Sequence, residues 1–150
     1  MRLWLLVVLV VFSIVGMTST ALATSHDQGK ADLNALMQPA VDLARKTYPD
    51  ARDRFLRGLP PRHAFFVVTR LPVGTDGFEQ VFVAVDRIEG DTISGQLSSD
   101  VRRAPGYKKG DRYLLSESLV VDWLITRPDG TEEGNYIGKA LDRRHRGRKP

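Results

Sequence analysis

Apolar residues recur at steps of three and four between residues 31 and 57, which predicts an amphipathic helix. The positions that share its apolar face are Met37, Val41, Ala44, Tyr48, Ala51 or Arg52, and Phe55. Pro39 suits the first turn of a helix that begins near residue 38, because its missing N–H is not needed there. Pro49 predicts a kink, but the apolar stripe keeps its phase across it. The pattern therefore predicts one kinked helix.

After residue 61 the pattern changes to short segments rich in Val, Ile and Phe, separated by Gly, Pro and Asp. The predicted strands cover residues 64–70, 79–87, 92–98, 112–116, 119–126 and 135–141. Their connections are too short for parallel crossovers, so the sheet should be antiparallel. We therefore predict an α+β fold, in which the kinked N-terminal helix packs on one face of a small, strongly twisted antiparallel sheet of about five to six strands. This helix is the only element predicted to cover a face of the sheet.

The first 23 residues have the pattern of a secretory signal peptide. Arg2 is followed by an apolar run over residues 3–15, and small residues end at Ala23. We predict cleavage after Ala23 and a periplasmic or secreted mature protein without a transmembrane helix. The alternative is a retained anchor, although this apolar run is shorter than the ~20 residues that cross a bilayer.

Charge divides the remaining chain into three parts: a disordered lead-in (24–30), one domain (31–141) and a disordered basic tail (142–150). The chain carries 22 Lys+Arg and 18 Asp+Glu, a formal net charge of +4. Five of these basic residues lie in the tail, beside one acidic residue, so the domain itself is close to neutral. Cysteine is absent, which excludes disulfides, thiolate catalysis and cysteine-ligated metals.

Candidate catalytic residues are few. The sequence has no Gly-rich phosphate loop, no Gly-x-Ser-x-Gly and no His-Glu-x-x-His, and we predict no cofactor and no metal site. Asp122 and Glu79 could form a pair of carboxylates with separated pKa values, and His63 could act as a general base. The alternative is that Asp122 caps a turn, Trp123 anchors the core and His63 is a polar group at a strand edge.

Candidate binding residues occur in one strand, one loop and the tail. Trp123, which follows Asp122 in the same predicted strand, is a candidate ligand contact. The loop residues Arg102, Arg103, Tyr107, Lys108 and Lys109 could hold an anionic group, or they could simply be solvated. The tail residues that could contact an anionic lipid or other polyanion are Arg143, Arg144, Arg146 and Arg148. The alternative for the tail is a solubilising end.

Several short motifs occur in an order that resembles a known family. They lie at residues 79–85, 90–97, 109–111, 121–123 and 134–136. This order is similar to that of the domain of unknown function 2314 family, the YegJ-like bacterial proteins, over about residues 31–141. Phe82 stands where a Trp is common in that family, and Ser99 where an Asn is expected. The resemblance implies a small α+β domain, often exported, with no assigned activity and no catalytic residues.

Together these features predict a non-enzymatic binding or interaction protein of the cell envelope. The expected partner is an envelope protein or an anionic envelope component, with membrane-surface contact through the basic tail. Nucleic acid is not expected, because the protein is predicted to be exported. The alternative function is an envelope-directed hydrolase that uses Asp122 and Glu79.

Overall fold

The computed structural model describes residues 21–147, with side chains described over residues 35–147. Residues 1–20 of the predicted signal peptide, and Arg148 and Lys149 of the predicted tail, lie outside the described residues. The chain divides into two compact units, Met1–Asn34 and Ala35–Pro150. Helix α1 (Ala21–Arg57) begins in the first unit and ends in the second. The packing described below concerns the second unit alone.

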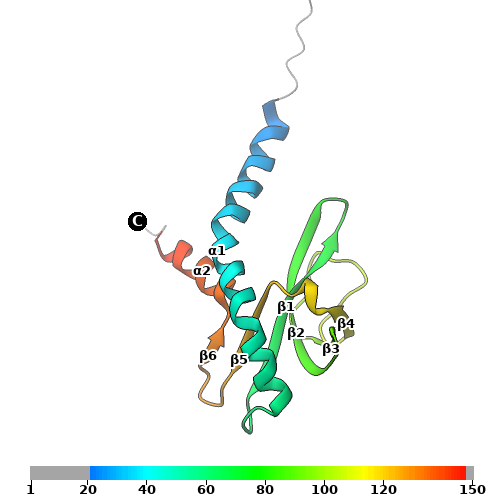
Figure 1. Cartoon of the computed structure of the whole chain (residues 1–150). Helices are drawn as coiled ribbons and strands as arrows, with labels where there is room; N and C mark the ends of the chain where they lie inside the picture. The colour runs from blue at the N-terminus through cyan, green and yellow to red at the C-terminus, as the bar shows by residue number, and fades with distance from the viewer. Residues whose placement is uncertain (1–20, 148–150) are drawn as a thin grey trace, which may run out of the picture. The chain divides into compact units, whose positions relative to one another are not determined.

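Six antiparallel strands form one open sheet in the order β4-β3-β2-β1-β5-β6 (Figure 1). Their bounds are β1 (Ala64–Val73), β2 (Gly77–Glu89), β3 (Thr92–Leu97), β4 (Arg112–Ser116), β5 (Asp122–Thr126) and β6 (Glu132–Gly134). A short 3-10 helix, η1 (Glu117–Leu119), connects β4 to β5, where the sequence predicts the start of a strand. The predicted α+β class with an antiparallel sheet is confirmed.

The main core lies between one face of the sheet and α1 from residue 35 onward (Figure 1). Alternate residues of the central strands, such as Val67 and Val83, have no exposed surface. Ala44 and Ala51 of α1 are also fully buried against them, and these small side chains allow the helix to approach the sheet closely. The predicted helical stripe is therefore the face that packs on the sheet.

A second helix, α2 (Tyr136–Arg146), packs beside β5, where it contacts α1 and one buried residue of the other face of the sheet. Its Ile137 packs with Val41, Val68 and Val121 in a smaller cluster. Val68 follows Val67 along β1, so the two side chains point to opposite faces. The prediction that one helix is the only cover of the sheet is therefore wrong.

The predicted strand over residues 135–141 is also wrong, because the backbone turns before it. Gly134 (φ 80°) and Asn135 (φ 54°) are both in the left-handed region, which ends β6. A Cβ at Gly134 would collide with the carbonyl oxygen of Trp123, so only glycine fits there. Ile137 and Leu141 are then four residues apart on one face of a helix.

Helical structure also replaces two segments that the sequence predicts to be disordered. Residues 24–30 belong to α1, so Pro39 lies inside this helix and not in its first turn as the sequence predicts. Residues 142–146 belong to α2, whose last turn holds basic side chains at the end that favours positive charge. The predicted tail is therefore ordered up to Arg146.

Candidate functional site

Asp122, the first predicted catalytic carboxylate, joins the start of β5 to the start of α2. Its side chain is 1 % exposed. The Trp123 N–H donates to Asp122 Oδ1 at 2.8 Å, and the Ile137 N–H donates to Oδ2 at 2.7 Å. Burial raises the pKa of Asp122, while the N–H bonds from Ile137 and Trp123 act against this rise. Both oxygens serve as acceptors for backbone groups, which is the capping role in the alternative interpretation.

Glu79, the second carboxylate, is held by three successive backbone N–H groups of the loop between β3 and β4. The N–H of Arg102 donates to Oε1 at 2.9 Å, and those of Arg103 and Ala104 donate to Oε2 at 2.6 and 2.9 Å. The N–H bonds from Arg102 and Arg103 hold the pKa of Glu79 below its usual value. Glu79 therefore fixes the loop to β2.

This arrangement predicts a pH-dependent loss of stability in the variant Glu79→Gln. The depressed pKa means that Glu79 stabilises the fold above its unfolded value of 4.5, and that this contribution is lost as the pH falls through the folded pKa. The variant should melt at a lower temperature than the native chain at pH 7 and at the same temperature near pH 2. Glu89→Gln, at an exposed pair, is the control. A difference that persists unchanged in acid would contradict this role.

The three predicted catalytic residues do not come together. Asp122 pairs with Val68 and Glu79 pairs with Leu71 on opposite sides of β1. Since Val68 and Leu71 are three residues apart, the two carboxylates lie on opposite faces of the sheet. His63 precedes β1, five residues and thus about 16 Å along the strand from Val68. The hydrolase alternative therefore lacks the geometry that it needs.

The charged side chains that line the pocket beside His63 are arginines. Its Nδ1 lies 3.2 Å from the Pro61 carbonyl oxygen, and it lines a shallow pocket with Arg54, Arg57 and Arg127. Arg54 and Arg127 both pair with Glu133 at the edge of this region. Within residues 35–147 we find no cluster of His, Asp or Glu that could hold a metal ion.

Trp123 is a core residue, which corrects its prediction as a binding contact. It is 2 % exposed and lies edge-on to Tyr136 with ring centroids 6.0 Å apart. The indole N–H lies 3.2 Å from the Ala44 carbonyl oxygen and 3.1 Å from Thr47 Oγ1 of α1. Trp123 thus anchors α1 to the sheet and is closed to ligands.

The basic loop over residues 99–109 is tied to its surroundings. Besides the bonds to Glu79, the Arg103 guanidinium donates to the Phe78 carbonyl oxygen at 2.7 Å. Lys109 Nζ lies 3.7 Å from Asp100, and the Lys108 N–H donates to Asp111. Tyr107 packs edge-on against Tyr113. The basic side chains of Arg103 and Lys109 thus have partners within the chain, whereas those of Arg102 and Lys108 have none among the described residues.

The predicted tail residues Arg143, Arg144 and Arg146 lie on α2 and form no ion pair among the described residues. Arg143 and Arg146 are exposed and Arg144 is half-buried. Helix α2 therefore presents cations from a fixed backbone. The sequence predicts these residues but not their helical arrangement.

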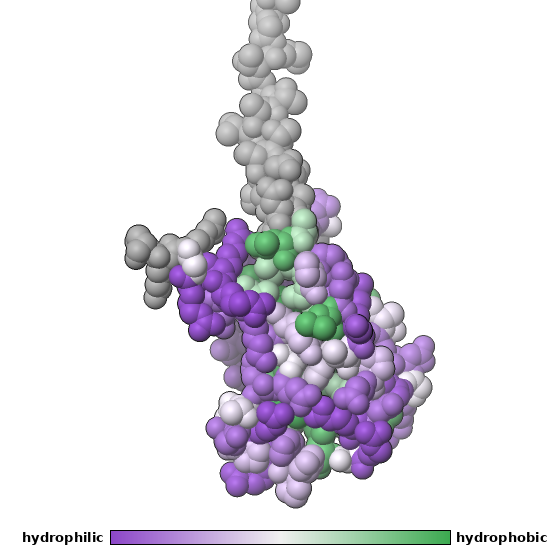
Figure 2. All heavy atoms as spheres, turned by 60° about the vertical axis from the view of Figure 1, so that its left-hand side comes forward, coloured by the Kyte–Doolittle hydropathy of each residue, from purple (hydrophilic) through white to green (hydrophobic). Residues whose placement is uncertain are grey.

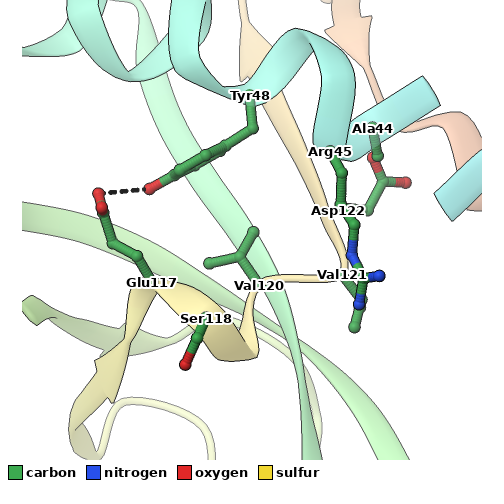
Figure 3. A pocket seen from close by; sticks show the side chains of 8 residues that line it. All are labelled: Ala44, Arg45, Tyr48, Glu117, Ser118, Val120, Val121 and Asp122. Carbon is green, nitrogen blue, oxygen red and sulfur yellow. Dashed lines mark hydrogen bonds between the residues drawn. The ribbon is translucent and has the colours of Figure 1, made fainter. Parts of the chain in front are cut away.

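Two features of α1 were missed from the sequence because they depend on contacts between distant elements. The first is a cavity of about 190 Å³ beside η1, lined by Ala44, Arg45, Tyr48, Glu117, Ser118, Val120, Val121 and Asp122. Figure 3 shows the Tyr48 hydroxyl directed at Glu117, to which it donates at 2.9 Å, with Arg45 on the other side of the pocket. Burial raises the pKa of Tyr48 well above its usual value. Arg52 also donates to Glu117, at 2.6 Å, so this carboxylate ties α1 to η1.

The second missed feature is a groove of about 440 Å³, which we call the α1–α2 groove. Its lining residues are Leu36, Pro39, Ala40, Leu43, Tyr136, Lys139, Ala140 and Arg143. In Figure 2, hydrophobic side chains gather on this face, bordered by hydrophilic ones. Leu36 and Leu43 remain 54 % and 45 % exposed. The groove could not be found from a sequence whose second helix is predicted to be a strand.

Comparison of the chain with protein-family models, with curated proteins and with solved structures found no match. The resemblance to the domain of unknown function 2314 family therefore stays a prediction. Within residues 21–147, no helix has both the length and the hydropathy required to cross a membrane.

Proposed function

We propose that this chain is an exported, non-enzymatic protein of the cell envelope that binds an anionic lipid surface through helix α2. The observation that carries the proposal is the set of three arginines on α2 that have no ion-pair partner among the described residues. Export rests on the pattern of the first 23 residues.

The capping roles of the carboxylates support the non-enzymatic part of this proposal. Asp122 accepts backbone N–H groups at both oxygens, and Glu79 does the same on the opposite face of the sheet. A general acid or base must be able to reach the proton that it moves. Asp122 is buried, and Glu79 lies on the opposite face of the sheet, so the two carboxylates are not arranged to act as a pair.

Helix α2 is well placed to keep its cations available. Asp122 fixes its first turn and Ile137 buries its apolar side, so the basic residues project from a backbone that the core holds. Each Lys or Arg near an anionic surface contributes roughly 1 kcal/mol. Three arginines therefore account for about a 100-fold change in binding.

The test uses the processed chain isolated from the producing cell, with its N-terminus determined by mass spectrometry. We expect it to sediment with vesicles that contain phosphatidylglycerol, but not with pure phosphatidylcholine vesicles, at 50 mM salt. The triple variant with Arg143, Arg144 and Arg146 changed to Gln should bind about 100-fold more weakly.

The matched control is a second triple variant, which removes three positive charges outside α2. Its exposed residues Lys46, Arg57 and Arg62 are changed to Gln. This control should keep nearly all of the native binding. Equal losses in the two variants would show only a general charge effect and contradict the assignment to α2.

A further inference from the structure

The α1–α2 groove has an apolar α1 side and an α2 side that combines Tyr136 and Ala140 with two cationic residues. Its α1 residues lie at positions 36, 39, 40 and 43, and its α2 residues at 136, 139, 140 and 143. Both sets have the spacing of a single helix face, so the two stripes run along opposite sides of the groove. Leu36 and Leu43 are large apolar side chains that the chain itself leaves about half exposed.

The charged residues that line the groove are both cationic, and both belong to α2. Lys139 and Arg143 lie on the α2 side, and no acidic side chain is among the lining residues. The Lys139 ammonium donates to the Gly134 carbonyl oxygen at 2.7 Å, while Arg143 has no ion pair within the part of the chain that the structure describes. The groove therefore suits an occupant that places an apolar part against α1 and an anionic group against α2.

The size of the groove favours a narrow occupant. Its volume of about 440 Å³ lies within the usual range of small-molecule sites. A helix is about 10–12 Å across with its side chains, so roughly one turn of a partner helix would fill this space. An extended hydrocarbon chain is much thinner and could run along the groove.

We propose that the α1–α2 groove binds the acyl chain of an anionic amphiphile, with the head group beside Arg143. This inference rests on the proposed function and specifies it: α2 attracts the anionic surface, and the groove takes one chain from it. Burial of the chain would cover Leu36 and Leu43, and the Arg143 guanidinium would pair with the anionic head group.

The probe is dodecyl phosphate below its micellar concentration, titrated calorimetrically into the processed chain. We expect saturable binding of one molecule, which strengthens up to about fourfold per methylene across a series of shorter alkyl phosphates. Dodecyl maltoside, which has the same chain but no charge, should bind at least tenfold more weakly.

Two pairs of variants separate the groove from the rest of the surface. Leu43→Gln and Arg143→Gln should each weaken dodecyl phosphate binding by at least tenfold. Leu56→Gln changes a residue on the same helix that is 49 % exposed and outside the groove, and Arg57→Gln removes an equal charge from an exposed position of α1 outside the groove. These two controls should bind within twofold of the native chain.

Three outcomes would overturn the inference: no dependence on chain length, equal effects of Arg143→Gln and Arg57→Gln, or binding of an acidic amphipathic peptide at the groove with no binding of dodecyl phosphate. Vesicle binding that still depends on the α2 arginines would then leave the proposed function intact. Loss of that dependence would instead contradict the proposed function itself.

Discussion

Trp123→Ala is expected to lower the free energy of unfolding by about 3–5 kcal/mol, because it removes the largest side chain of the core. A domain of this size has a total stability of about 5–15 kcal/mol, so the variant should lose a large fraction of its stability and melt at a lower temperature. Chemical denaturation monitored by circular dichroism measures this difference.

A second variant separates packing from hydrogen bonding. Trp123→Phe keeps an aromatic ring but removes the indole N–H that meets the Ala44 carbonyl oxygen and Thr47 Oγ1 of α1. It should cost less than Trp123→Ala and leave vesicle binding per folded molecule unchanged. A Trp123→Ala variant that is as stable as the native chain but binds no vesicles would show that Trp123 is a binding residue after all.

Asp122→Ala is expected to lower the free energy of unfolding by about 1–3 kcal/mol, since it leaves two buried backbone N–H groups without an acceptor. Asp122→Asn should also destabilise the chain, because its amide can present an oxygen to only one of the two donors. Denaturation of both variants beside Asp50→Asn, whose carboxylate is exposed, measures these effects.

The pH dependence of Asp122 has a sign opposite to that of Glu79. Burial raises its folded pKa above the unfolded value of 3.8, so its ionisation costs stability above the folded pKa. This cost is relieved as the pH falls toward 3.8. Native stability of Asp122→Ala, together with loss of a hydrolytic activity, would contradict the capping role and favour the enzyme alternative.

The sheet could be predicted from the sequence because its signals are local. Alternation around Val81 and Val83 and the Gly90-Asp91 turn each occur within a few residues, and the strands form where these signals lie. The stripe that includes Ala44 likewise predicts the buried face of α1. Segments with strong periodicity specify their own structure.

Helix α2 could not be predicted in this way, because the contact that positions it is not local. Asp122 receives the Ile137 N–H across fifteen residues, and the Gly134–Asn135 turn that redirects the chain has no strong signal of its own. A run of seven mostly apolar or small residues is compatible with either a strand or a helix. The groove, which needs both helices, was missed for the same reason.

The roles of Glu79 and Trp123 also depend on partners that are distant in the chain. Glu79 holds a loop more than twenty residues away, and Trp123 bonds to a helix more than seventy residues earlier. From sequence alone, Glu79 and the Asp122-Trp123 pair are equally compatible with catalysis, capping or packing. Only the fold assigns these residues to caps and core.

Amide hydrogen exchange of the processed chain, with and without anionic vesicles, tests most directly where this protein binds. The competing cationic surface is the loop over residues 99–109, which Glu79 holds on the β2 side of the sheet. We predict that the vesicles slow exchange in Tyr136–Arg146 and leave the loop unchanged. Slower exchange in the loop, with none in α2, would contradict the account.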